Sequence, residues 1–255
     1  MIAREVRLFL IALQFLTRVR IKRIDPFPDD WLPRAAKYMP VVGALIGAVV
    51  GAVLLVSAAL CPAPLPIVIA LVVSLLLTGA LHEDGLADTA DAFGGGATRE
   101  RCLEIMKDSR IGTYGTLALI MTLALKGTAL AQIDPISAAR VLIAGYAGAR
   151  LAAVLALAIL PYAGGEIAKV SRTPSRMTVG EIVIAAVSAT IVGFCSLDAM
   201  VFVVATLVAL AAAAAVTWMA RRKIGGYTGD VLGAVEQVYE TTFLIVAAAI
   251  VTGPG

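Results

Sequence analysis

The chain of 255 residues carries a net charge of +3, and 60% of its residues are hydrophobic while only 15% are charged. A soluble domain has about 25% charged and roughly 45–50% apolar residues, so the composition indicates that lipid is the main solvent of this chain. The apolar content excludes a disordered protein, the three cysteines exclude a disulfide-stabilised scaffold, and the small net charge argues against charge-driven binding of nucleic acid.

The N-terminal residues 1–24 predict an amphipathic helix that lies on the cytoplasmic leaflet of a membrane. Arg4, Arg7, Gln14 and Arg18 fall on one helical stripe, and leucine and phenylalanine side chains cover much of the remaining surface. The apolar core of this segment is short and no small-residue cleavage site follows it, which argues against a signal peptide.

Seven long apolar runs then predict transmembrane helices, because about 20 mostly apolar residues cross the hydrocarbon core and each must satisfy its own backbone in lipid. The predicted spans are 39–60, 66–81, 113–131, 136–160, 179–197, 199–220 and 231–251. Residues 1–255 are therefore predicted to form a single integral-membrane domain, an all-α polytopic helical bundle. Gly43, Gly47 and Gly51 in the first span form a small-residue face that predicts close helix packing.

The basic residues predict the orientation of these spans. Of the 21 Lys and Arg residues, 18 precede the first span or lie in the connections after the second, fourth and sixth spans, while the other connections hold none. Because basic loops stay in the cytoplasm, we predict a cytoplasmic N-terminus and a C-terminus outside.

Three basic residues lie within the predicted spans. Lys126 and Arg140 are near the outer ends of their spans, where snorkelling of the side chain towards the surface would explain them. Arg150 is at membrane depth, where an unpaired charge is costly, so it is a candidate functional residue. A structural ion pair of Arg150 with Glu236 or Glu240 is the alternative.

Acidic residues concentrate in the predicted cytoplasmic stretch 82–115, which also holds the only histidine, His82. Asp84, Asp88 and Asp91 are spaced i, i+4, i+7, so on a helix continuing from the second span they would share one face. A solvated acidic face and a divalent-cation site both fit this spacing. The position at the end of a membrane helix favours the cation site, and carboxylate oxygens suit Mg²⁺.

Glycines and cations follow the acidic cluster. The run Gly94, Gly95 and Gly96 would offer backbone N–H groups to an anion, although glycine runs usually just make turns. Lys107, Asp108 and Arg110 add two cations and another acid. Metal-binding acids beside phosphate-binding cations predict a site for phosphotransfer.

A second polar cluster, residues 221–230, precedes the last span and lies on the same predicted membrane face. It combines three basic residues with Gly225, Gly226, Thr228, Gly229 and Asp230. Positive-inside topology alone would explain the basic residues, but a glycine-rich loop at a helix N-terminus is also a natural phosphate cradle. We predict that this cluster meets the 82–115 stretch. Alternatively, Asp230 caps the last helix, or Thr228 and the glycines bind a nucleoside through backbone groups alone.

Several stretches of the chain resemble the cobalamin synthase family, the adenosylcobinamide-GDP ribazoletransferases. The specific motifs are 82–91 and 105–115, and the supporting ones are 14–18, 40–43 and 225–230. The similarity runs in order over nearly the whole chain. One departure is Ala92, where the family commonly has glycine. The acidic cluster also resembles, more loosely, that of CDP-alcohol phosphotransferases, which run the same type of reaction.

The resemblance implies a Mg²⁺-dependent enzyme of the bacterial inner membrane, with its active site on the cytoplasmic face and its C-terminus in the periplasm. It would join adenosylcobinamide-GDP to α-ribazole, or to the 5′-phosphate of α-ribazole, and release GMP in the last assembly steps of vitamin B12. The rival hypothesis is a polytopic membrane transporter, against which the acids gather at one membrane face rather than at the midplane. A homo-oligomer stays open.

On this hypothesis the site residues fall into three groups. The expected metal ligands are Asp84, Asp88, Asp91, Asp108 and Asp230. Lys107 and Arg110 would offset charge on the leaving GMP, and either Asp91 or His82 would take the proton of the attacking hydroxyl, although a lone histidine at a helix end is more often structural. The expected substrate-binding residues are Gly94, Gly95, Gly96, Arg150, Gly225, Gly226, Thr228 and Gly229.

Overall fold

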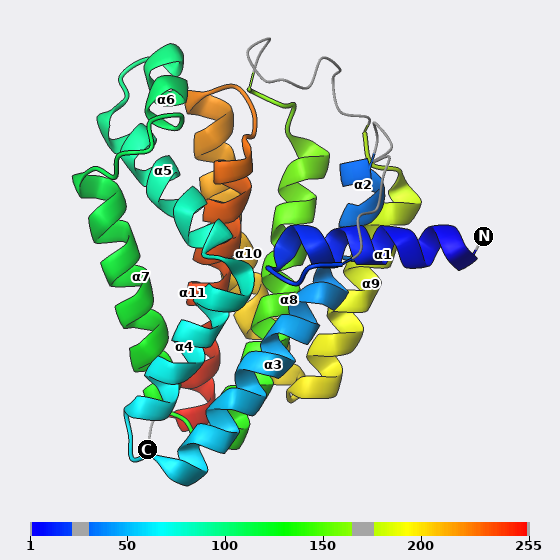
Figure 1. Cartoon of the computed structure of the whole chain (residues 1–255), viewed down its shortest axis with the longest axis vertical. Helices are drawn as coiled ribbons and strands as arrows, with labels where there is room; N and C mark the ends of the chain where they lie inside the picture. The colour runs from blue at the N-terminus through cyan, green and yellow to red at the C-terminus, as the bar shows by residue number, and fades with distance from the viewer. Residues whose placement is uncertain (1, 22–30, 165–175, 254–255) are drawn as a thin grey trace.

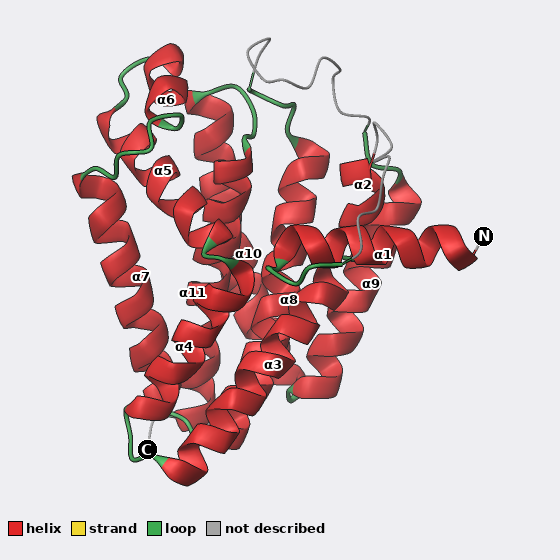
Figure 2. Cartoon of the chain, in the orientation of Figure 1, coloured by secondary structure: helices red, strands yellow, loops and turns green. Residues whose placement is uncertain are grey.

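The computed structural model describes residues 2–21, 31–164 and 176–253, and in these ranges the chain is helical with no β-strand (Figure 2). The helices are α1 (Ile2–Leu16), α2 (Trp31–Ala36), α3 (Met39–Leu60), α4 (Leu65–Thr78), α5 (Leu81–Gly95), α6 (Arg99–Ile105), α7 (Thr113–Ala131), α8 (Pro135–Ile159), α9 (Val179–Ser196), α10 (Ala199–Lys223) and α11 (Gly229–Thr252). The predicted all-α architecture is confirmed.

Some of the residues used in the sequence predictions lie outside these ranges. They are the basic residues Lys22, Arg23, Lys169 and Arg172, together with residues 22–24 of the predicted interfacial helix.

Helix α8 is the centre of the bundle, where it packs against α3, α9 and α11. Its buried face consists mostly of alanine and glycine, which lets neighbouring backbones come close. The glycine face of α3 uses this closeness, because a Cβ atom at Gly47 would lie 2.7 Å from the carbonyl oxygen of Leu142. Gly43 and Gly51 also face α8, near Tyr146 and Ala139. The predicted packing role of this face is confirmed.

Six helices in the described ranges, α3 and α7 to α11, are long and apolar enough to cross a membrane. The second predicted span differs from the prediction. It forms the 14-residue α4, about 21 Å long at 1.5 Å per residue, against a hydrocarbon core of about 30 Å. The chain then bends by 88° into α5, because Gly79 and Ala80 adopt left-handed backbone conformations with φ of 67° and 55°. The acidic segment is therefore not a straight continuation of the second span.

The bent pair α4 and α5 still carries the chain from the end of the bundle near the C-terminus to the end occupied by α6 (Figure 1). Counted as one span, it brings the number of crossings to seven. The prediction of an all-α polytopic membrane protein is confirmed.

Helix α1 lies across the bundle, crosswise to α8 and α9 (Figure 1). Leu8, Ile11, Ala12 and Leu16 form its buried face. Glu5 fixes it to the residues before α3, since the carboxylate pairs with Lys37 at 2.6 Å and accepts a hydrogen bond of 2.6 Å from the hydroxyl of Tyr38. These bonds lower the pKa of Glu5. The placement of α1 at a membrane surface stays a prediction.

Candidate active site

The bend after α4 places the acidic helix α5 against the first turns of α11. The approach is close enough to require glycine at two positions. A Cβ atom at Gly85 would lie 2.7 Å from the carbonyl oxygen of Asp230, and one at Gly233 would lie 3.1 Å from that of His82. The two polar clusters of the sequence therefore meet, as predicted.

Three carboxylates of the predicted set come together at this contact. Asp88 lies within electrostatic reach of Asp84 and Asp230, which also repel each other. Among the described residues, no ion pair joins any of the three to a lysine or arginine. Concentrated negative charge of this kind is stable only when a proton or a bound cation offsets it.

The donor set fits a magnesium ion. Within the described residues, no three His, Cys, Asp or Glu side chains are arranged to surround an ion. Mg²⁺ does not require this, because it usually keeps several waters and binds one or two carboxylates together with substrate phosphates. Asp84, Asp88 and Asp230 have the right chemistry for such a shell, and the magnesium itself stays a prediction.

Asp91 belongs to the same helix but has different surroundings. It is buried, and its two carboxylate oxygens accept hydrogen bonds from the backbone N–H groups of Gly112 at 2.7 Å and Gly115 at 2.9 Å. These N–H groups belong to the first turn of α7 and have no partner within that helix. Asp91 thus anchors α7 to α5. Its predicted roles as metal ligand and as proton acceptor compete with this use of both oxygens.

The connection between α6 and α7 carries Lys107, Asp108 and Arg110. Arg110 binds the carboxylate of Asp108 through two nitrogens, Nη2 at 2.6 Å and Nε at 3.0 Å. These bonds lower the pKa of Asp108 to about 2. Asp108 is therefore paired with Arg110, two residues further along the chain. Lys107 is exposed at the surface.

A network of buried charges joins the four helices α5, α7, α8 and α11 close to the carboxylates. Arg150 of α8 pairs with Glu236 at 3.3 Å and Glu240 at 3.1 Å, so the structural alternative for Arg150 is present. His82 of α5 lies 3.0 Å from Glu236 through Nε2 and 3.4 Å from Arg150 through Nδ1. Both ring nitrogens of the histidine therefore lie beside charged side chains.

The interpretation of Lys126 as a snorkelling residue is wrong. Its side chain is 2% exposed, and its ammonium group lies 2.6 Å from Glu240 and 2.6 Å from the amide oxygen of Gln237. The amide nitrogen of Gln237 in turn donates to Glu83. Sequence reasoning missed this network because the partners of Lys126 lie more than 100 residues further along the chain.

The N-terminus of α11 is capped by Thr228, and the alternative that Asp230 caps this helix is therefore wrong. Thr228 is the N-cap of α11, and its hydroxyl accepts a hydrogen bond from the N–H of Val231 at 3.2 Å. Asp230 is already inside the helix, so its carboxylate is not needed as a cap. This leaves the Asp230 carboxylate beside Asp84 and Asp88.

The predicted substrate-binding glycines serve different purposes. Gly225 has a φ of 79°, which other residues rarely adopt, and Gly226 packs against the carbonyl group of Pro161. Gly94 packs on the ring of Tyr114 and Gly96 on Cys102. Gly95, Gly225 and Gly229 have no atom within 3.5 Å of an added Cβ, so space is open beside these three.

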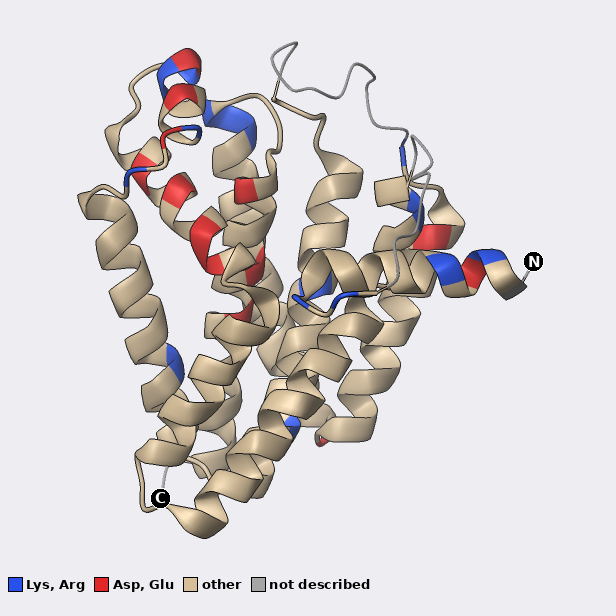
Figure 3. Ribbon diagram, in the orientation of Figure 1, with Lys and Arg blue, Asp and Glu red and all other residues tan. Residues whose placement is uncertain are grey.

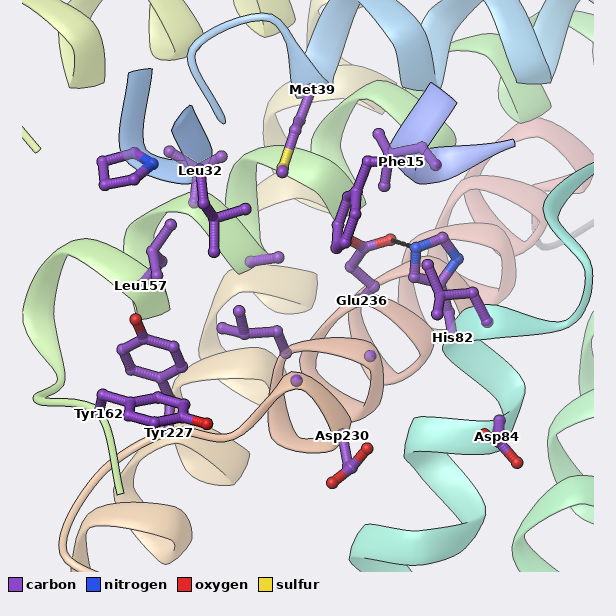
Figure 4. A pocket seen from close by; sticks show the side chains of 18 of the residues that line it. Phe15, Leu32, Met39, His82, Asp84, Leu157, Tyr162, Tyr227, Asp230 and Glu236 are labelled. Carbon is purple, nitrogen blue, oxygen red and sulfur yellow. Dashed lines mark ion pairs between the residues drawn. The ribbon is translucent and has the colours of Figure 1, made fainter. Parts of the chain in front are cut away.

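A cavity of about 410 Å³ opens beside the carboxylates (Figure 4). Its polar side consists of His82, Asp84, Asp230 and Glu236, and Gly229 also lines it. The rest of its wall is apolar or aromatic. It comes mostly from α1, α2, α8, the start of α3 and the loops that contain Tyr162 and Tyr227. Sequence reasoning did not find this cavity, because its wall is drawn from segments scattered along the chain.

These features define an integral-membrane, all-α protein with carboxylates gathered beside an amphiphilic cavity. A family model described as cobalamin-5-phosphate synthase matches residues 8–248, and the chain belongs to this family. The resemblance seen in the sequence is confirmed.

Similar proteins include adenosylcobinamide-GDP ribazoletransferases from three bacteria. The one from Leptothrix cholodnii is 40% identical over 92% of each chain. That of Bradyrhizobium diazoefficiens is 40% identical over 95% of this chain and 94% of its own, and that of Shewanella piezotolerans is 36% identical over 96% and 97%. No solved structure matches the chain.

Proposed function

We propose that this protein joins adenosylcobinamide-GDP to α-ribazole, or to the 5′-phosphate of α-ribazole, and releases GMP. The observation that carries the proposal is the family match over residues 8–248, whose named relatives are transferases for this pair of substrates. The meeting of Asp84, Asp88 and Asp230 beside a cavity supports it, because carboxylates can hold the metal ions that offset the charge of a pyrophosphate during phosphotransfer.

The reaction is a substitution at phosphorus. A ribose hydroxyl of the nucleoside attacks the phosphorus on the cobinamide side of the pyrophosphate, and a new P–O bond forms. The P–O bond to the GMP phosphate breaks, and GMP leaves with the electron pair. An aspartate of the cluster takes the hydroxyl proton, and Lys107 and Arg110 offset charge on the leaving GMP. A magnesium ion held by one or two of the carboxylates of Asp84, Asp88 and Asp230 would supply positive charge that offsets the charge of the pyrophosphate.

The proposed setting is the bacterial inner membrane, with this site on the cytoplasmic face and the C-terminus in the periplasm. The distribution of charge supports this orientation, since the basic residues gather around α1, α2, α6 and the end of α10, away from the C-terminal end of the bundle (Figure 3). A transporter is not favoured, because Asp84, Asp88 and Asp230 gather at the contact between α5 and the start of α11 and the charges at membrane depth are paired.

The test is turnover by the purified full chain in lipid nanodiscs. With adenosylcobinamide-GDP, α-ribazole and Mg²⁺, we expect GMP and adenosylcobalamin in equal amounts, measured by mass spectrometry. Chelation of the divalent cation should stop the reaction. Turnover that persists in chelator would contradict the magnesium proposal alone, whereas counterflow uptake without GMP release would contradict the enzyme and support a transporter.

A further inference from the structure

The cavity beside the carboxylates has an aromatic side and an acidic side. Tyr162, Tyr227 and Leu157 lie on one side and Asp84 on the other, with Asp230 between them (Figure 4). A wall divided in this way matches a ligand with an apolar body and a polar end. The volume of about 410 Å³ is in the lower part of the range of about 300–1,000 Å³ for small-molecule sites.

Two aromatic pairs supply flat surfaces to the wall. Phe15 and Trp31 meet edge to face with ring centroids 5.5 Å apart, and Tyr162 and Tyr227 do so at 5.4 Å. The contact within each pair leaves one ring accessible, because Phe15 is 43% and Tyr162 is 40% exposed. Such rings bind another flat ring through stacked or edge contacts.

The tyrosine pair is held rigidly before any ligand arrives. The N–H of Ala163 donates to the carbonyl of Tyr227 at 2.8 Å, and the N–H of Tyr227 donates to the carbonyl of Pro161 at 2.9 Å. Arg99 of α6 bonds the carbonyl groups of Ile224 and Ala163. A preformed wall loses little conformational entropy on binding, which is a feature of ligand sites.

The charge of the lining excludes some ligands. Among the described residues that line the cavity there is no lysine or arginine, and three of the four residues on its polar side are carboxylates, those of Asp84, Asp230 and Glu236. These carboxylates would repel a pyrophosphate, and of the two proposed acceptors they favour free α-ribazole over its 5′-phosphate. A corrinoid carrying a nucleotide is many times larger than the cavity, and a guanine base would leave most of its polar edge facing apolar side chains.

We propose that this cavity binds the nucleoside acceptor, with the methylated benzimidazole ring of α-ribazole between the aromatic pairs and its ribose hydroxyls towards Asp84 and Asp230. This inference rests on the proposed function and assigns one of its two substrates to a place. The pyrophosphate of the other substrate then lies outside the cavity, on the far side of the carboxylates. The attacking hydroxyl is thereby delivered to the aspartates that take its proton.

A binding measurement tests the assignment without turnover. The chain has two tryptophans, so Trp218→Phe leaves Trp31 of the cavity wall as the only one. In nanodiscs, titration of this variant with α-ribazole alone should give a saturable change in tryptophan fluorescence, and titration with guanosine should not. No change with α-ribazole, or an equal change with guanosine or on altering the lipid acyl chains, would overturn the proposal.

Steady-state kinetics give the second test, with a matched control. Phe15→Ala should raise the KM for α-ribazole about tenfold, the effect of losing about 1.4 kcal/mol of ring contact, and leave the KM for adenosylcobinamide-GDP within about twofold. Phe194→Ala is the control, because Phe194 is similarly exposed and has a similar edge contact with Phe202 but does not line the cavity. A rise in the KM for adenosylcobinamide-GDP instead would overturn the proposal.

A filling substitution covers the case in which Phe15→Ala does not fold. Gly229 lines the cavity and Gly180 does not, and neither has an atom within 4 Å of an added Cβ. Gly229→Leu should weaken α-ribazole binding at least tenfold, whereas Gly180→Leu should not. If the wild-type chain binds α-ribazole but produces no GMP, the proposed reaction fails and this site stands. If it turns over and Gly229→Leu binds normally, the site fails and the reaction stands.

Discussion

Asp88 and Asp91 are one turn apart on α5, yet their different surroundings indicate different roles. Asp88 faces Asp84 and Asp230 with no paired cation among the described residues, whereas Asp91 is buried under the start of α7 and receives two backbone hydrogen bonds. The spacing in the sequence placed both on one face and so assigned both to the metal. The contact between Asp91 and α7 depends on a connection that folds back over α5, which helical spacing does not describe.

We expect Asp88→Asn to lower kcat/KM by at least about 10²-fold, or roughly 2.7 kcal/mol of transition-state stabilisation. The midpoint of thermal unfolding should not fall, because the change removes repulsion among carboxylates. Asp198→Asn is the control, since Asp198 is exposed and makes no cap hydrogen bond at the start of α10. Near-normal turnover by the Asp88 variant would contradict a functional role for the cluster.

The opposite pattern is expected for Asp91→Asn. An asparagine has one oxygen for two N–H donors, so one donor is left without a partner in a buried place, which costs about 1–3 kcal/mol of unfolding free energy. Asp134→Asn is the control, because Asp134 caps α8 through two similar bonds but is exposed, and asparagine is an equally good cap. Lost turnover with unchanged unfolding free energy would favour Asp91 as a metal ligand over its role as an anchor.

At the scale of helices, buried charges join α5, α7, α8 and α11 into one unit. The chain of contacts runs from His82 to Glu236, Arg150, Glu240 and Lys126. It begins at the cavity wall with His82 and Glu236 and ends between α7 and α11. In lipid these charges cannot be solvated by water and must stay paired with one another. The network therefore fixes the relative positions of the helices that carry Asp84, Asp88 and Asp230.

Lys126→Met should therefore be strongly destabilising, by about 3–5 kcal/mol, because it leaves buried Glu240 with one partner fewer and Gln237 with an unpaired oxygen. Arg140→Met, at an exposed position on α8, should change the unfolding free energy by less than about 1 kcal/mol. The double variant Lys126→Met with Glu240→Gln should regain part of the loss. Equal unfolding free energies for the two single variants would show that the buried pairs contribute nothing.

Helices were more predictable than the contacts between them. Lipid allows few structures, so apolar length alone located α3 and α7 to α11 to within a few residues, and the small-residue face of α3 indicated its partner surface. The bend at Gly79 and Ala80 was missed because a glycine inside an apolar run is usually tolerated in a helix. Lys126 was misread because its partners are distant in sequence, and hydropathy carries no information about pairing.

At the scale of the whole molecule, the bend decides the topology. If α4 and α5 together cross the membrane, the chain has seven crossings and its ends lie on opposite sides. If they form a re-entrant segment, the crossings number six and both ends lie on the same side. The path of the ribbon from the C-terminal end of the bundle to the α6 end favours a crossing (Figure 1).

A reporter that is active only in the cytoplasm, fused after Gly255, should therefore be silent, whereas the same reporter inserted at Ala97, between α5 and α6, should be active. Ala97 and Gln132 are exposed. Gln132 follows the end of α7, and Ala97 precedes α6, the short helix before α7. Helix α7 is long and apolar enough to cross a membrane without a bend. In a variant without native cysteines, Gln132→Cys should react from outside with a membrane-impermeant thiol reagent, and Ala97→Cys should react only after the membrane is opened. The two cysteine variants are a control for the two reporter fusions, because they show on which side of the membrane α7 begins without any assumption about α4 and α5. If Gln132→Cys reacts from outside while the reporter after Gly255 is active, one of the later predicted spans does not cross. If Ala97→Cys reacts from outside, the carboxylates face the periplasm, and a site that uses a nucleotide-linked substrate made in the cytoplasm could not lie there.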